Sequence, residues 1–156
     1  MDYIEAIDEV GLKQGQYSIF LAGGITGCGD WQAEMVQYLS DLDVTLVNPR
    51  RKNFPIDDPR AAEEQIKWEF GYLQAVDAIS FWFPKETLCP ITLYELGSWM
   101  HSSKPLFIGV HPEYKRRHDV EIQTRLARKD QVIVYSIDEL AGQIKRHDRH
   151  PKIWPF

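Results

Sequence analysis

The chain has 156 residues, of which 44% are hydrophobic and 26% are charged, and its formal net charge is −5 at pH 7. Because this length suits one domain with a core of its own, we expect a single domain over the whole chain, with its core at about residues 17–146 and a short extension at either end. The mixed composition excludes disordered, collagen-like and coiled-coil proteins. The acidic balance disfavours a basic nucleic-acid-binding surface, so we expect no nucleic-acid partner.

Cysteine spacing and hydropathy exclude further classes of protein. The two cysteines, Cys28 and Cys89, form no CxxC pair, and the five histidines have no metal-ligand spacing, so we expect no bound metal ion. No cofactor is expected either. The first ten residues carry acidic side chains where a signal peptide needs basic ones. No apolar run reaches the ~18 residues that span a bilayer, so we expect a cytoplasmic protein without membrane contact.

Five continuous apolar runs predict five buried strands. They lie at residues 17–22, 44–47, 78–83, 106–110 and 132–135. A helical pattern follows each run, at residues 31–40, 61–75, 91–102, 118–128 and from 137 onward. Because the runs are apolar throughout rather than alternating, they indicate an α/β protein with a doubly wound parallel sheet and helices on both faces. Ligands of such sheets bind at the carboxyl ends of the strands.

An N-cap residue and the spacing of apolar residues predict features of the first two helices. Asp30 is a favourable N-cap for the helix that follows the first strand. In the second helix, the spacing of Ile66, Phe70 and Leu73 predicts that these apolar side chains share one face. A polar, proline-marked loop over residues 50–59 separates this helix from the second strand.

The glycine-rich turn after the first strand is the first candidate binding element. It contains Gly23 and Gly24 directly after Ala22. Glycines let a ligand approach the backbone, and the following helix directs free amides towards it. The turn lacks the Gly-Lys-Ser/Thr ending of a P-loop, and its glycine spacing runs opposite to the dinucleotide fingerprint. The alternative is a tight strand–helix turn without a ligand.

Two glutamates lie on the helices that flank the third strand. Glu95 falls near the start of the helix after this strand, and Glu69 lies eight residues before Asp77, in the preceding helix. Two such carboxylates can divide the roles of nucleophile and proton donor. In the alternative, Glu95 complements a helix dipole and Glu69 lies on a solvated surface.

Other residues near the third strand have weaker signals. Asp77 opens the strand and has a turn or cap role as its alternative. Trp82 near the strand's end, together with Trp31 and Tyr94, can stack on a flat base, but each has a place in the core as its alternative. Neither cysteine has an activating neighbour, so we propose no cysteine nucleophile.

Five segments with characteristic spacing occur in order along the chain. They are Phe20-Leu-Ala-Gly-Gly-Ile-Thr-Gly27, Val47-Asn-Pro-Arg50, Trp68-Glu69, Asp77-Ala-Ile-Ser-Phe-Trp-Phe-Pro84 and Glu95-Leu-Gly97. Together they resemble the nucleoside 2-deoxyribosyltransferase superfamily over roughly residues 18–110. The resemblance implies a flavodoxin-like, five-stranded sheet in the order 2-1-3-4-5. It also implies an enzyme that cleaves the N-glycosidic bond of a (deoxy)nucleoside or its 5′-monophosphate.

The resemblance assigns roles to single residues. Glu95, in the Glu-Leu-Gly segment, is expected to be the nucleophile that attacks the anomeric carbon and forms a glycosyl-enzyme ester, which then passes to another base or to water. Glu69 occupies the position of the acid that assists the leaving base, as Glu where transferases carry Asp. The candidate substrate-binding residues are Ala22, Gly23, Gly24, Asp77, Trp82, Cys89, Thr92 and Tyr94.

One position departs from the family. Cys89 stands six residues before Glu95, where transferases carry an aspartate and monophosphate hydrolases a serine. Two alternatives therefore stay open: a hydrolase of nucleoside 5′-monophosphates or NAD-type N-glycosides, and a non-catalytic nucleotide-binding module. The resemblance also implies a homo-oligomer, a dimer or larger. The aromatic tail at residues 153–156 is expected to dock on a partner subunit or on its own domain.

Overall fold

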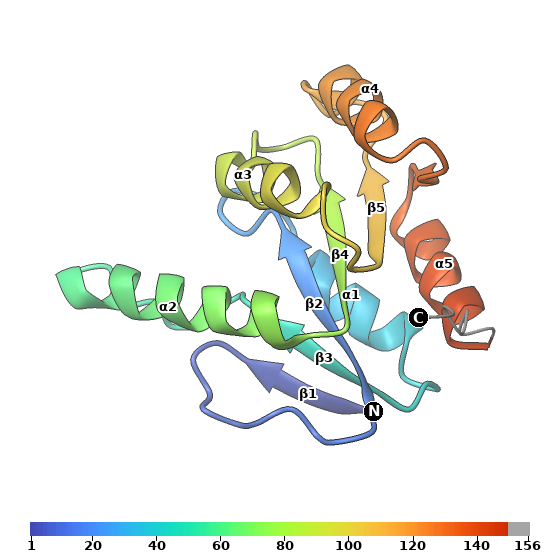
Figure 1. The fold of residues 1–156 in the computed structure, drawn as a ribbon. Coiled ribbons are helices and arrows are strands. Elements are labelled where there is room, and N and C mark those ends of the chain that lie inside the picture. Colours follow the sequence, from blue (N-terminus) through green and yellow to red (C-terminus); the bar gives the residue numbers. More distant parts are fainter. Residues whose placement is uncertain (150–156) are drawn as a thin grey trace.

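The computed structural model describes residues 1–149, which form a six-stranded parallel sheet with helices on both faces (Figure 1). The strands are β1 (Asp2–Glu5), β2 (Tyr17–Gly23), β3 (Val44–Asn48), β4 (Ala78–Phe83), β5 (Leu106–Val110) and β6 (Ile133–Val134). The helices are α1 (Trp31–Tyr38), α2 (Pro59–Ala75), α3 (Pro90–Trp99), α4 (Arg117–Ala127) and α5 (Ile137–Arg149). The aromatic tail lies outside the described residues.

The prediction of five strands in the order 2-1-3-4-5 was wrong. The sheet has the order β1-β3-β2-β4-β5-β6, because residues near the N-terminus add an edge strand beside β3. In β1 only Ile4 is buried, and the strand carries Asp2 and Glu5 at its ends. Such a short, charged strand is typical of a sheet edge and has no apolar run that sequence analysis could detect. The other strands keep the expected neighbours.

Two hydrophobic cores lie on opposite faces of the sheet. Along β4, Phe81 and Phe83 face the core beneath α2, α3 and α4, whereas Trp82 faces the core beneath α1 and α5. This alternation follows from the two-residue period of a strand. Both faces of the central strands are therefore buried, which confirms the layered α/β arrangement predicted from continuous apolar runs.

Helix α1 begins as the sequence predicts. Its N-cap is Asp30, whose Oδ1 accepts a hydrogen bond from the backbone N of Ala33 at 3.0 Å.

No helix within residues 1–149 is long and apolar enough to cross a membrane.

The apolar face predicted for α2 is buried only in part. Leu73 packs in the core, but Ile66 is 64% exposed and Phe70 is 65% exposed. The helix projects past the sheet in Figure 1, so little of the domain covers its middle. A periodic pattern gives the face on which apolar residues lie, but it does not establish that another element covers this face.

Candidate active site

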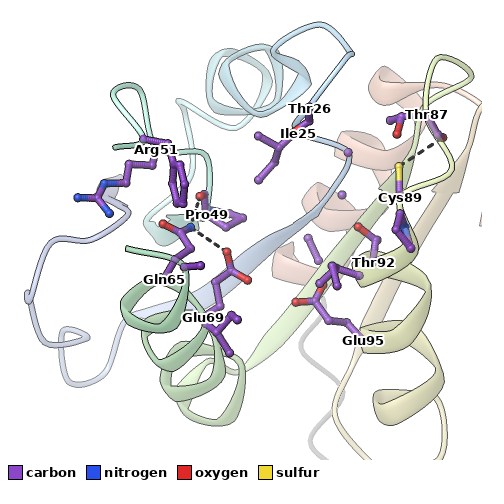
Figure 2. Close-up of a pocket in the computed structure, with 18 of the residues that line it drawn as sticks. Ile25, Thr26, Pro49, Arg51, Gln65, Glu69, Thr87, Cys89, Thr92 and Glu95 are labelled. Carbon is purple, nitrogen blue, oxygen red and sulfur yellow. Dashed lines mark hydrogen bonds between the residues drawn. The ribbon is translucent and has the colours of Figure 1, made fainter. Parts of the chain in front are cut away.

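A cavity of about 730 Å³ opens at the carboxyl edge of the sheet, between α2 and α3 (Figure 2). Its floor contains Ala22, Gly23 and Gly24 at the end of β2, and Pro49 lines it from the loop after β3. This volume is in the range of small-molecule sites, roughly 300–1,000 Å³. The position is the one expected for ligands of doubly wound sheets.

The two glutamates predicted to act together lie on opposite walls of this cavity. Figure 2 shows the carboxyl group of Glu69, on α2, and that of Glu95, on α3, directed towards one another. Leu73, one turn after Glu69, is buried in the core, as is Leu96 beside Glu95, and these contacts hold the two helices against the sheet. Helix packing therefore places both carboxyl groups in a single cavity.

The environment of the pair keeps a proton bound near neutral pH. Burial raises the pKa of Glu95 from its ordinary 4.5 to about 8, and the charge of Glu69 adds to this shift. Burial likewise raises the pKa of Glu69. Within residues 1–149 the carboxyl of Glu95 has no hydrogen-bond or ion-pair partner. A buried carboxyl group whose pKa is raised by burial and by a second carboxyl group is a candidate for nucleophilic or acid–base chemistry.

Gln65 links Glu69 to the loop after β3. Its side-chain Nε2 donates to the carbonyl oxygen of Pro49 at 2.7 Å and to Oε1 of Glu69 at 2.8 Å. This bond to the carboxylate lowers the pKa of Glu69, against the larger effect of burial. Sequence analysis missed Gln65, although its spacing of four residues from Glu69 on a helix is a detectable signal.

The loop after β3 supplies two further residues that sequence analysis missed. The guanidinium of Arg51 lies 5.8 Å from the centre of the Phe54 ring and 3.5 Å from the carboxylate of Glu64. Arg51 and Phe54 both line the cavity. The loop is polar and lacks regular periodicity, so no pattern in it indicated which side chains turn inward.

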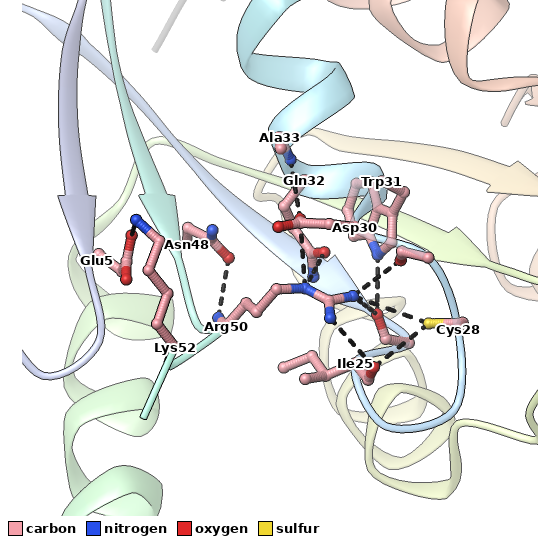
Figure 3. Close-up of polar contacts among 12 residues, drawn as sticks. Glu5, Ile25, Cys28, Asp30, Trp31, Gln32, Ala33, Asn48, Arg50 and Lys52 are labelled. Carbon is pink, nitrogen blue, oxygen red and sulfur yellow. Dashed lines mark hydrogen bonds and ion pairs between the residues drawn. The ribbon is translucent and has the colours of Figure 1, made fainter. Parts of the chain in front are cut away.

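Arg50 holds the glycine-rich turn in place (Figure 3). Its guanidinium donates to the carbonyl oxygens of Ile25 at 3.2 Å and Gly29 at 2.9 Å, and to Oε1 of Gln32 at 2.9 Å. It also pairs with Asp30 at 3.3 Å. Arg50 stands in one of the five ordered segments, but sequence analysis gave it no role. Its contacts fix the backbone that lines one end of the cavity.

Close packing explains why Gly23 and Gly24 carry no side chain. A Cβ at Gly23 would lie 2.5 Å from the Trp31 ring and 2.6 Å from the carbonyl oxygen of Trp82. A Cβ at Gly24 would lie 2.6 Å from the Pro84 ring. Both glycines line the cavity, yet a tight strand–helix turn without a ligand is sufficient to explain why glycine is needed at these positions.

We expect Gly23→Ala to lower the free energy of unfolding by about 2–3 kcal/mol, because the Trp82 carbonyl belongs to a central strand and cannot move aside. Gly29→Ala is the matched control, since a Cβ there meets nothing within 4 Å. The control should change stability by less than ~0.5 kcal/mol. Urea denaturation with equal m-values measures both. Equal stabilities of the two variants would contradict the packing explanation.

Three of the predicted substrate-binding residues lie outside the cavity lining. Asp77 lies at the amino end of β4, where its Oδ2 accepts bonds from the backbone N of Ser18 at 2.8 Å and its hydroxyl at 2.7 Å. Trp82 is buried in the core on the other face of the sheet. Tyr94 is 76% exposed beside the cavity-lining Glu95. The contacts of Asp77 and Trp82 agree with the structural alternatives considered for them.

Cys89 and Thr92 line the cavity at the start of α3. Cys89 is the N-cap residue and has a φ of 48°, in the left-handed region. Burial raises the pKa of its thiol to about 12, and Sγ donates to the carbonyl oxygen of Thr87 at 3.5 Å. A thiol in this environment stays protonated and is a poor nucleophile.

Within residues 1–149, no group of three or more His, Cys, Asp or Glu side chains is arranged so that it could hold a metal ion.

An α/β sheet with paired carboxyl groups in a cavity at its carboxyl edge defines a class of protein suited to chemistry on small molecules. The sequence model of the family described as "Nucleoside 2-deoxyribosyltransferase like" matches residues 16–114, and the chain belongs to this family. The match covers Glu69, Glu95 and the strands β2 to β5, and it confirms the resemblance inferred from the five ordered segments. A comparison with curated protein sequences finds no match.

Proposed function

We propose that this protein cleaves the N-glycosidic bond of a (deoxy)nucleoside and passes the sugar to another base or to water, with Glu95 as nucleophile. The observation that supports this most is the pair of carboxyl groups, Glu69 and Glu95, which face one another in a single cavity. The chain's membership of a nucleoside 2-deoxyribosyltransferase-like family supports the choice of substrate.

The proposed reaction has two steps. The reactive form of the pair is the one with the proton on Glu69 and with Glu95 ionised. In the first step an oxygen of Glu95 attacks C1′ of the sugar, the bond from C1′ to the base nitrogen breaks, and its electron pair leaves with the base. Glu69 supplies the proton that neutralises the departing base, and an ester joins Glu95 to the sugar. In the second, a new base or a water molecule attacks C1′ and gives its proton to Glu69, and Glu95 leaves as a carboxylate.

Base release from a panel of substrates tests this function. The panel contains purine and pyrimidine (deoxy)nucleosides, their 5′-monophosphates and NAD, and chromatography measures the free base. Release that requires a second base indicates transfer, whereas release in water alone indicates hydrolysis. Selective cleavage of monophosphates or NAD would favour the first alternative function. Ligand-induced thermal stabilisation without any product would indicate the non-catalytic alternative and contradict the proposal.

We also propose that the chain forms a homo-oligomer through the apolar rim, the exposed side chains beside the cavity. They are Ile56 at 86%, Ile66 at 64%, Phe70 at 65% and Ile91 at 64% exposure. Ile56, Ile66 and Ile91 also line the cavity. Grouped apolar side chains of this kind mark interaction surfaces, and a second copy would cover both the rim and the cavity mouth.

We expect Phe70→Glu to convert the oligomer into monomers, because a charge on the apolar rim cannot be buried without a partner. Light scattering after size-exclusion chromatography measures the mass. Ile122→Glu is the control, since Ile122 is 56% exposed but lies on α4, away from the cavity lining. A wild-type protein that is monomeric at all concentrations would contradict the proposal.

A further inference from the structure

We propose that Gln65 is a positioning residue, which fixes the oxygen of Glu69 that carries the transferable proton. The proposal rests on the acid–base role of Glu69 in the proposed function. It assigns to Gln65 an effect on the reaction that is exerted through Glu69 rather than through contact with the reacting atoms.

The contacts of Gln65 determine the orientation of its amide. Nε2 donates to the carbonyl oxygen of Pro49 and to Oε1 of Glu69, at 2.7 and 2.8 Å. Both partners are acceptors, so the flipped amide would place its carbonyl oxygen against two other oxygens. The –NH₂ group of Gln65 therefore points to Glu69, as Figure 2 shows.

This bond distinguishes the two oxygens of the Glu69 carboxyl. Oε1 is occupied as an acceptor, and a proton on Oε1 would collide with the N–H of Gln65. The proton of Glu69 therefore resides on Oε2, which Figure 2 shows on the side that faces Glu95 across the cavity. Because Oε1 accepts in both protonation states, the bond persists while Oε2 gives its proton to the leaving base and later recovers one.

The second bond of Gln65 anchors this arrangement to the sheet. Pro49 directly follows β3, so its carbonyl is held by the sheet edge rather than by α2. Glu69 is thereby positioned relative to the cavity floor and not only along its own helix.

Two substitutions with opposite effects test the proposal. Gln65→Leu removes the donor, so the pKa of Glu69 should rise by about 1 unit, the size expected for a hydrogen bond to a charged group. Gln65→Lys retains a donor and adds a positive charge, so the pKa of Glu69 should fall below that of the wild type. Carboxyl ¹³C NMR titration measures this pKa directly, with Glu69→Gln to assign the signal.

Turnover gives the second measurement. In Gln65→Leu we expect the pH profile of kcat to move to higher pH and kcat at its optimum to fall roughly 10-fold, part of what a general acid contributes. KM should change less than about 2-fold, because Gln65 acts on proton transfer and not on sugar binding. Gln74→Leu, on the exposed side of the same helix, is the matched control and should behave as the wild type.

The outcomes separate this proposal from the proposed function. If the wild type turns over but neither variant shifts the pKa of Glu69, the role of Gln65 is refuted while the function stands. If the wild type has no turnover on any substrate, the proposed function fails, and a pKa that moves in opposite directions in the two variants still supports Gln65 as the residue that orients Glu69. Equal shifts in both variants would indicate a structural disturbance and overturn the inference.

Discussion

Glu95→Gln is expected to reduce base release at least ~10³-fold, because an amide oxygen is too weak a nucleophile to form the sugar ester. The assay uses the best nucleoside from the substrate panel. Mass spectrometry of the wild type, stopped during turnover, should show one added sugar, and this adduct should be missing from the variant. Glu34→Gln, an exposed substitution on α1, controls for the loss of a negative charge. Full activity in Glu95→Gln would contradict the assignment.

The wild type should lose stability with rising pH in a way that Glu95→Gln does not. In the folded protein Glu95 has a pKa of about 8, whereas its ordinary value, expected in the unfolded chain, is 4.5. Between these values the folded state retains a proton that the unfolded state has lost, so the wild type loses stability as pH rises through this window. Below pH 4.5 both states are protonated, and this contribution is fully present.

Glutamine does not ionise and has no such slope. Glu95→Gln should therefore match the wild type near pH 4.5 and exceed its free energy of unfolding by roughly 1–3 kcal/mol above pH 8, after allowance for the partial exposure of the side chain. Urea denaturation across this pH range gives the difference. A stable variant also shows that lost turnover is not lost folding. A difference that stays constant with pH would contradict the burial of this carboxyl.

Topology explains why the carboxylate pair could be predicted from the sequence. Glu69 lies on the helix before β4 and Glu95 on the helix after it, and both helices cover the same face of the sheet. The apolar runs established the order of strands and helices, and this order brings the two helices to one edge. This order does not determine which face of each helix carries its glutamate, and the structure shows that both glutamates face the cavity.

The side chains that were misplaced depend on finer geometry. Tyr94 and Glu95 are adjacent on a helix, where successive side chains differ by about 100° in direction, and here Glu95 lines the cavity while Tyr94 is exposed to solvent. Trp82 alternates with Phe81 and Phe83, and which of them faces the cavity side depends on the helices that cover each face. Motif residues alone give neither the direction of a side chain on a helix nor the sheet face on which a strand residue lies.

The contacts that hold the site together could not be found from local patterns. Arg50 reaches carbonyl groups 21 and 25 residues earlier in the chain, and Gln65 reaches Pro49 across 16 residues. Such bonds leave no periodic signal, because their partners are backbone atoms that every residue possesses. Long-range polar contacts of this kind therefore require coordinates, as does the charged edge strand β1, whereas the apolar strands and the helices can be found from the sequence.

Glu69→Gln is expected to slow release of an ordinary base by about 10²–10⁴-fold, because the base must then leave without a proton. A sugar donor whose leaving group is stable as an anion, such as nitrophenolate, needs no proton and should retain most of its rate. We measure kcat of the wild type and of Glu69→Gln with both donors. A loss of proton transfer lowers kcat for the ordinary base alone, whereas a loss of binding affects both donors. Gln preserves the size of the side chain and an oxygen that can accept the bond from Gln65.

The pH dependence of the activated donor adds an independent check. The charge of Glu69 is one cause of the raised pKa of Glu95, so its removal should lower the pKa of Glu95 from about 8. The nucleophile then ionises at lower pH, and the acidic limb of the profile should move in the same direction. If the substitution slows both donors equally and leaves the acidic limb in place, Glu69 contributes to binding and another group protonates the base.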